Sequence, residues 1–262
     1  MSYLQRYESG ECGAWDELVS LAPQVLADSD LRTEAEAVAE ALMLRVRKNA
    51  AVLRETLSAS GAWIADETAP LTANDLKFLT EKFGPLPLSL DVFYRTVGSI
   101  KLIPKADYNY GDDVTLEQAD GVSLIALDPL QVEAATELTW LVEECSEDPD
   151  YPFDEFYFYL SPDYLHKQNI SGGMSYSVQL PSPTAQEALD PAVRFERHEL
   201  SFVKYLRYCF RWGGFPGLDV CEHTDEDDVP LNWRIGFYTV EGPWRPAYRR
   251  LPDSLTKGLV DF

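Results

Sequence analysis

Residues on which most enzyme active sites and metal centres depend are scarce in this sequence. The 262 residues include three histidines, and the four cysteines, at positions 12, 145, 209 and 221, form no closely spaced pair. A Gly-x-Ser-x-Gly elbow, a P-loop, a His-Glu-x-x-His motif and a dinucleotide-binding fingerprint are all absent. We therefore expect a protein that is not an enzyme, with no catalytic residues, no cofactor and no bound metal.

Long apolar runs are also missing. No stretch approaches the roughly 20 consecutive apolar residues that cross a bilayer, and the first residues lack the basic and apolar regions of a secretory signal. These absences predict a cytoplasmic protein that neither enters nor binds a membrane. In that reducing compartment the scattered cysteines are expected to behave as small apolar residues.

Basic residues are few compared with acidic ones. Lys and Arg number 22 against 44 Asp and Glu, which gives a formal net charge of -22. Such a charge repels nucleic acid and anionic membranes and attracts basic proteins. Between residues 106 and 166, which we call the acidic window, there is no Lys or Arg, whereas 16 acids occur. Solubility would explain acids mixed with bases, but a function explains a self-repelling segment more readily.

The acidic window predicts a surface that binds a protein partner, such as a basic toxin domain whose nucleic-acid ligand the carboxylates would mimic. Aromatic residues lie among the acids, and such rings often supply the binding energy of interfaces. On the predicted strand 156–160, about half of the rings must face the core. The candidate partner-binding residues are Asp112, Asp113, Glu143, Glu144, Glu147, Asp148, Asp150, Tyr151, Asp154 and Glu155. The alternative is a set of solvated loops without a partner.

Three groups of residues carry ligand atoms for a metal, and each lacks the pattern of a known site. Two are acidic clusters without the glycine and terminal glutamate of a calcium-binding EF-hand loop. The third has soft ligands without a paired spacing or a fourth ligand for zinc. The groups are Asp107, Asn109, Asp112 and Asp113; Glu147, Asp148, Asp150 and Asp154; and Cys209, Cys221 and His223.

The order of predicted elements is helices first and strands later. The strongest helix, of about 27 residues, follows a possible Thr33–Glu36 capping box and ends before Gly61. Its apolar stripe is Val38, Leu42, Val46, Leu53 and Leu57. Further helices are predicted at 74–83, 90–97 and 200–212, strands at 122–127, 156–160, 175–180 and 233–240, and a last strand and turn within 244–262. This order predicts an α+β fold, with a helical region at 1–65 followed by an α+β domain at 66–262.

Residues 84–98, GPLPLSLDVFYRTVG, resemble the signature that opens the SUKH superfamily. The shared features are a Leu-Pro element, a short helix with two adjacent aromatics, and a closing turn, here Val97-Gly98-Ser99 where members usually have an Asn-Gly-Gly-like turn. The later strands and the helix near Leu200 are similar too, so the resemblance covers about residues 71–212. It implies a curved, mostly antiparallel sheet flanked by helices, and the function of an immunity protein that neutralises a bacterial toxin by binding it. It carries over no catalytic residues, because the family has no shared active site.

Two other functions remain open at this point. With 44 acids some pair of carboxylates must lie close together, and such a pair in a cleft would serve a hydrolase. Alternatively, the long N-terminal helix would use its apolar stripe to join a second copy of the chain, as in a scaffold protein.

Overall fold

The computed structural model describes residues 1–59, 63–64, 70–104, 128–135, 156–163, 167, 173–222 and 251–262. The helices are α1 (Tyr3–Glu8), α2 (Gly13–Ser20), α3 (Ala22–Ala27), α4 (Ser29–Ala59), α5 (Ala73–Phe83), α6 (Leu88–Thr96), α9 (Ala185–Leu189), α10 (Phe202–Arg211) and α13 (Leu251–Leu255), with a 3-10 helix η3 (Pro216–Glu222). The strands are β1 (Trp63–Ile64), β2 (Ile100–Lys101), β3 (Ile103–Pro104), β4 (Gln131–Val132), β5 (Phe156–Ser161) and β6 (Tyr176–Leu180). Helices combined with small antiparallel pairs confirm the predicted α+β class. Among the described residues, no helix has the length and apolar character of a membrane span.

Helix α4 begins earlier than the sequence pattern predicts. The carboxylate of Asp28 accepts the backbone N–H groups of Asp30 and Leu31, which makes Asp28 the capping residue. Thr33 lies inside the helix, where its hydroxyl donates to the carbonyl of Ser29. The predicted capping box of Thr33 and Glu36 is therefore wrong, and the helix has 31 residues.

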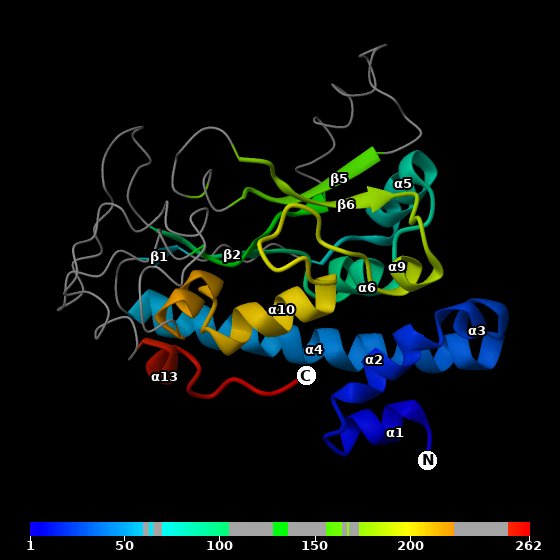
Figure 1. Ribbon diagram of the computed structural model, residues 1–262, viewed down its shortest axis with the longest axis horizontal. Helices are drawn as coiled ribbons and strands as arrows, with labels where there is room; N and C mark the ends of the chain where they lie inside the picture. Colours follow the sequence, from blue (N-terminus) through cyan, green and yellow to red (C-terminus); the bar gives the residue numbers. More distant parts are fainter. Residues whose placement is uncertain are drawn as a thin grey trace, which may run out of the picture.

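The apolar stripe of α4 is used inside the chain. Its five predicted members, from Val38 to Leu57, are all buried. Figure 1 shows α4 running along the described part, with α6 and α10 on one side and α1 and α2 on the other. The stripe is thus covered and does not face a second copy of the chain. One continuous apolar core crosses the predicted domain boundary at residues 65 and 66, and the division into two domains stays a prediction.

Helix α6 lies between α4 and the strands. Its neighbouring aromatics, Phe93 and Tyr94, are both fully buried, and Tyr94 meets Phe158 of β5 edge to face at 6.2 Å. The helix begins before the predicted position 90, so Ser89 lies inside it and donates to the buried carboxylate of Asp190 at 3.0 Å, while Pro87 occupies the capping position. The segment that resembles the SUKH signature is therefore part of the core.

The strands form three antiparallel pairs among the described residues, β1 with β3, β2 with β4, and β5 with β6. A hydrogen bond from the N–H of Glu133, just after β4, to the carbonyl of Leu160 joins the second pair to the third. Ser177 of β6 also forms an isolated antiparallel bridge with Arg194. The predicted strands 156–160 and 175–180 are confirmed as β5 and β6, and those at 122–127 and 233–240 lie outside the described residues.

The last described segment packs back on the helices. Its predicted strand is wrong where the structure describes it, because residues 251–255 form the helix α13. Beyond α13, the side-chain amide of buried Asn49 both donates to the carbonyl of Val260 and accepts its N–H, each at 2.8 Å. The ring of Phe262 meets that of Phe210 at 5.6 Å. These contacts attach the segment to α4 and α10, on the side of the molecule away from β5 and β6 (Figure 1).

Candidate functional site

The ten predicted partner-binding residues, from Asp112 to Glu155, all lie outside the described residues. The same holds for both acidic clusters weighed as calcium sites and for His223 of the zinc candidate. Within the described part of the chain, no three His, Cys, Asp or Glu side chains gather as metal ligands would. The site is therefore built from the described residues that border the acidic window.

Three acids of the window are described, and all three face inward. The carboxylate of Glu133 pairs with Lys101 at 2.6 Å, and Asp128 and Asp163 are 1% and 2% exposed. None of the three belongs to the ten candidate partner-binding residues. Packing explains their inward position, because a segment that contributes strands β4 and β5 must turn some residues inward. The ten candidates themselves stay a prediction.

Asp128 is the centre of a buried charged network. Its carboxylate accepts from the ammonium of Lys167 at 2.7 Å and from the hydroxyl of Tyr176 at 3.0 Å. The side chains of Lys167 and Asp128 are 0% and 2% exposed, and the ammonium also lies 5.0 Å from the ring centre of Tyr176. Burial raises the pKa of the Tyr176 phenol well above its ordinary value, so it stays a donor. Lys167 is the first basic residue after the window and neutralises one of the window's own acids.

A second part of this network holds a short loop between α9 and α10, residues 195–199. The buried carboxylate of Glu196 accepts the backbone N–H of His198 at 2.9 Å and of Leu200 at 3.4 Å. Burial raises the pKa of Glu196, an effect that the neighbouring His198 partly opposes. The inward-pointing carboxylate of Glu196 therefore holds the backbone of its own loop in place.

Asp219 of η3 also holds this loop in place through contacts with two of its side chains. Its carboxylate accepts from the hydroxyl of Tyr208 at 2.9 Å, lies 2.9 Å from Nε2 of His198 and pairs with the guanidinium of Arg197 at 3.5 Å. Burial alone would raise its pKa, but the contact with His198 and the charge of Arg197 hold the pKa of Asp219 below its ordinary value. The side chains of Arg197 and Asp219 are 5% and 4% exposed, so the loop carries a buried ion pair.

The loop presents an exposed ring at its start. Phe195 is 46% exposed and has a φ of 65°, a backbone conformation that aromatic residues rarely adopt. Strain of this kind persists where the surroundings impose it, and it collects at functional positions. Here the inward-facing Glu196 and Arg197 impose it, because they place their neighbour Phe195 outside.

Beside Phe195 lies Tyr157 of β5. Along this strand Phe158 and Leu160 are buried, whereas Tyr157 is 36% exposed, so the expected division of the rings between core and surface is confirmed. The ring centres of Tyr157 and Phe195 are 6.0 Å apart with a 51° tilt. We call these two residues the Tyr157–Phe195 pair. Tyr157 belongs to the aromatics of the acidic window, but nothing in the sequence singles out Phe195, whose position depends on the buried charges beneath it.

The charged network does not open into either described cavity. One cavity, of about 700 Å³, lies between α2, α4, α10 and the last segment, and the other, of about 440 Å³, lies between α3, α4, α6 and α9. Neither is lined by Asp128, Lys167, Glu196, Arg197 or Asp219. The charged side chains contact one another and the backbone of residues 195–200, and we assign them the role of holding this loop in place.

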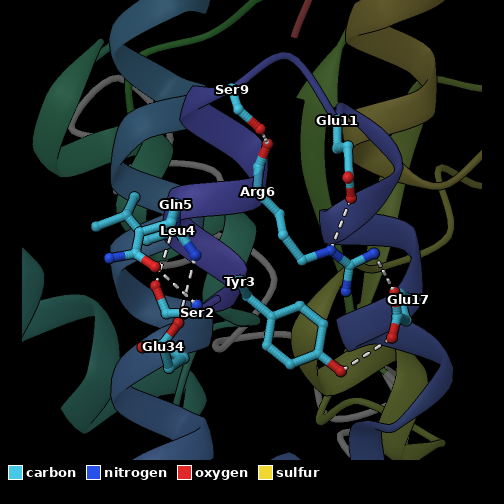
Figure 2. Close-up of polar contacts among 9 residues, drawn as sticks. All are labelled: Ser2, Tyr3, Leu4, Gln5, Arg6, Ser9, Glu11, Glu17 and Glu34. Atoms are coloured by element: carbon cyan, nitrogen blue, oxygen red, sulfur yellow. Dashed lines mark hydrogen bonds and ion pairs between the residues drawn. The ribbon is translucent and has the colours of Figure 1, made fainter.

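A further polar cluster lies at the N-terminus, where Figure 2 shows Arg6 between Glu11 and Glu17. Both ion pairs are 2.7 Å long, and the hydroxyl of Tyr3 also donates to Glu17. The hydrogen bonds from Arg6 lower the pKa of Glu17. The cluster joins α1 to α2 at the surface, where such pairs add little to stability, and we assign it this structural role.

Comparison with known proteins found no match among family models, curated proteins or solved structures. The SUKH resemblance of residues 84–98 therefore stays a prediction.

Proposed function

We propose that this chain is a non-enzymatic binding protein that recognises a basic protein, and that it serves as an immunity protein against a bacterial toxin, as the SUKH resemblance implies. The observation that carries the proposal is the Tyr157–Phe195 pair, two rings that lie exposed on the outer side of β5 and its neighbouring loop. Exposed aromatics at the centre of a polar surface are typical energetic centres of protein interfaces.

The way Phe195 is held supports a binding role. A solvent-exposed phenylalanine in a left-handed conformation costs the fold both hydration and backbone free energy. The buried carboxylate of Glu196 and the ion pair of Arg197 with Asp219 keep it there. A rigid ring loses little conformational entropy when a partner covers it, which favours affinity.

The negative charge of the chain indicates which kind of partner it would bind. Asp154 and Glu155 directly precede the first residue of β5 and stand three and two positions before Tyr157 in the sequence. The acidic window that includes this strand contains no Lys or Arg, and the whole chain carries a net charge of -22. Complementary charge accelerates association and selects the partner, so the fitting partner is a basic protein.

The described carboxylates favour binding over the hydrolase alternative. A hydrolase needs two carboxyl groups with separated pKa values that face one cavity. Burial raises the pKa of Asp190 and of Glu196. Both are instead occupied by neighbouring hydrogen bonds, Asp190 by those from Ser89 and the N–H of Val203, and neither lines a described cavity.

Replacing either ring by alanine should weaken binding of the partner. We expect Tyr157→Ala and Phe195→Ala each to raise the dissociation constant by about ten-fold or more, the effect of removing an energetic centre. The matched control is Leu44→Ala, because Leu44 is an apolar residue of α4 that is 57% exposed and belongs to neither β5 nor the loop 195–199. Calorimetric titration measures all three variants, and the control should bind as the wild type does.

The partner itself is sought among the products of the genes next to the one that encodes this chain, tested as purified proteins with basic candidates first. A stable complex that also suppresses the toxicity of the bound protein in co-expressing cells would support the proposal. Finding no binder among these products, or equal losses for Leu44→Ala and Phe195→Ala, would contradict it.

A further inference from the structure

We infer that the Tyr157–Phe195 pair is the receptor for an arginine side chain of the partner, held by cation–π contact. This inference rests on the proposed function and specifies it, since it names the chemical group that the two rings recognise.

The geometry of the rings permits such a contact. With a tilt of 51° and centres 6.0 Å apart, they are not stacked face to face, and each is more than one third exposed. A guanidinium within about 6 Å of a ring centre is attracted to its face. The chain already makes this contact elsewhere, with Arg45 at 4.3 Å from the ring centre of Tyr7 and Arg6 at 5.3 Å from that of Tyr3.

The charges around the pair favour a cation as the guest. The nearest basic residue in the sequence, Arg194, is neutralised by both carboxylate oxygens of Glu187 at 3.1 Å. At the far end of the loop, Glu199 is exposed. On the β5 side, Asp154 and Glu155 precede the strand. Thus no uncompensated positive charge is described here, and the formal charge of the flanking segments is negative.

Arginine fits better than lysine or an apolar side chain. Its planar guanidinium stacks on rings and is less strongly hydrated than an ammonium, so it loses less on leaving water. An apolar side chain would gain only from the two rings and nothing from the negative formal charge of the flanking segments. Arginine gains from the rings and from the negative charge. One experiment that removes the charge and keeps the shape of the side chain therefore tests the preference for arginine.

The test places 4-fluorophenylalanine at position 195 of the full chain and follows its fluorine NMR signal. The probe is a short arginine-rich peptide, and the matched control is the same peptide with every arginine replaced by citrulline, which has the same shape without the charge. We expect the arginine peptide to shift the signal saturably and the citrulline peptide to leave it in place. Phe195→Leu and Tyr157→Leu keep an apolar side chain but remove the aromatic ring. Each should raise the dissociation constant of the arginine peptide about two- to five-fold.

Two results would overturn the inference. In one, the arginine and citrulline peptides shift the signal equally, which would mean an apolar site. In the other, the arginine peptide binds the chain by calorimetry while the fluorine signal does not move. The proposed function would survive either result, because it requires a basic protein partner at this surface and not an arginine side chain on these two rings. Conversely, a saturable arginine shift without any protein partner would support the receptor and refute the immunity role.

Discussion

Replacing Lys167 by methionine should destabilise the fold by about 3–5 kcal/mol, because it leaves a buried carboxylate without its counter-charge. Asp128 is 1% exposed and keeps its hydrogen bond from Tyr176, but a single neutral donor does not replace an ammonium at 2.7 Å. Urea unfolding of the purified variant measures the loss. The matched control is Lys77→Met, since Lys77 pairs with Glu81 at 3.6 Å on the surface, with both side chains more than half exposed.

The control should lose no more than about 0.5 kcal/mol, the range of exposed i,i+4 pairs. Adding Asp128→Asn to Lys167→Met should recover part of the loss, because the amide keeps an acceptor for Tyr176 and carries no charge. Asparagine also tolerates the φ of 55° at this position. Equal losses for Lys167→Met and Lys77→Met would show that the buried pair does not organise the fold.

The second large effect is expected at Gly214. An alanine there would combine a φ of 89° with a Cβ only 2.5 Å from Cδ1 of Leu102 and 3.1 Å from Cδ1 of Leu53. The backbone has little room to move, because the N–H of Gly214 donates to Cys209 and its carbonyl accepts from Leu130. Strain and overpacking together should cost about 2–4 kcal/mol in urea unfolding.

Gly84 separates the two causes of that loss. It has a φ of 78° but no atom within 4 Å of an added Cβ, so Gly84→Ala carries the strain without the clash. We expect it to cost about 1 kcal/mol. If Gly84→Ala and Gly214→Ala lost the same stability, the close packing of Gly214 against Leu53 and Leu102 would not matter.

Long periodic segments were predictable from the sequence. The stripe of α4, the two strands β5 and β6, and helix α10 follow from the spacing of apolar residues, because burial against one core selects one face. Strands of two residues, such as β2 and β4, have no period to recognise. The start of α4 was misplaced because Asp28 and Thr33 both have side chains that cap helices, and only the folded backbone distinguishes them.

The site was predictable in part. Strand alternation indicates that some rings of 156–160 face outward, and Tyr157 does. Phe195 was not foreseen, because its exposure follows from the burial of Glu196 and Arg197 against residues distant in the sequence. The inward position of Asp128 was missed for the same reason, since its partner Lys167 lies 39 positions away. The number of charged residues in the sequence shows which region is acidic. It does not show which carboxylates form a buried ion pair in the fold.

The central claim is that a basic partner binds this region through its charge, and the dissociation constant tests it most directly. We would measure it for the wild type and for the combined variant Glu147→Lys, Asp148→Lys, Asp150→Lys and Asp154→Lys, at about 50 and 300 mM salt. A control that reverses the same number of exposed acids outside the window corrects for net charge. It consists of Glu8→Lys, Glu55→Lys, Glu81→Lys and Asp253→Lys.

In the wild type, binding should weaken as salt rises. The window variant should bind at least about ten-fold more weakly at low salt and lose most of the salt dependence. The control variant should keep most of the affinity and most of the salt dependence of the wild type. An unchanged dissociation constant in the window variant, or an equal loss in the control, would contradict the claim.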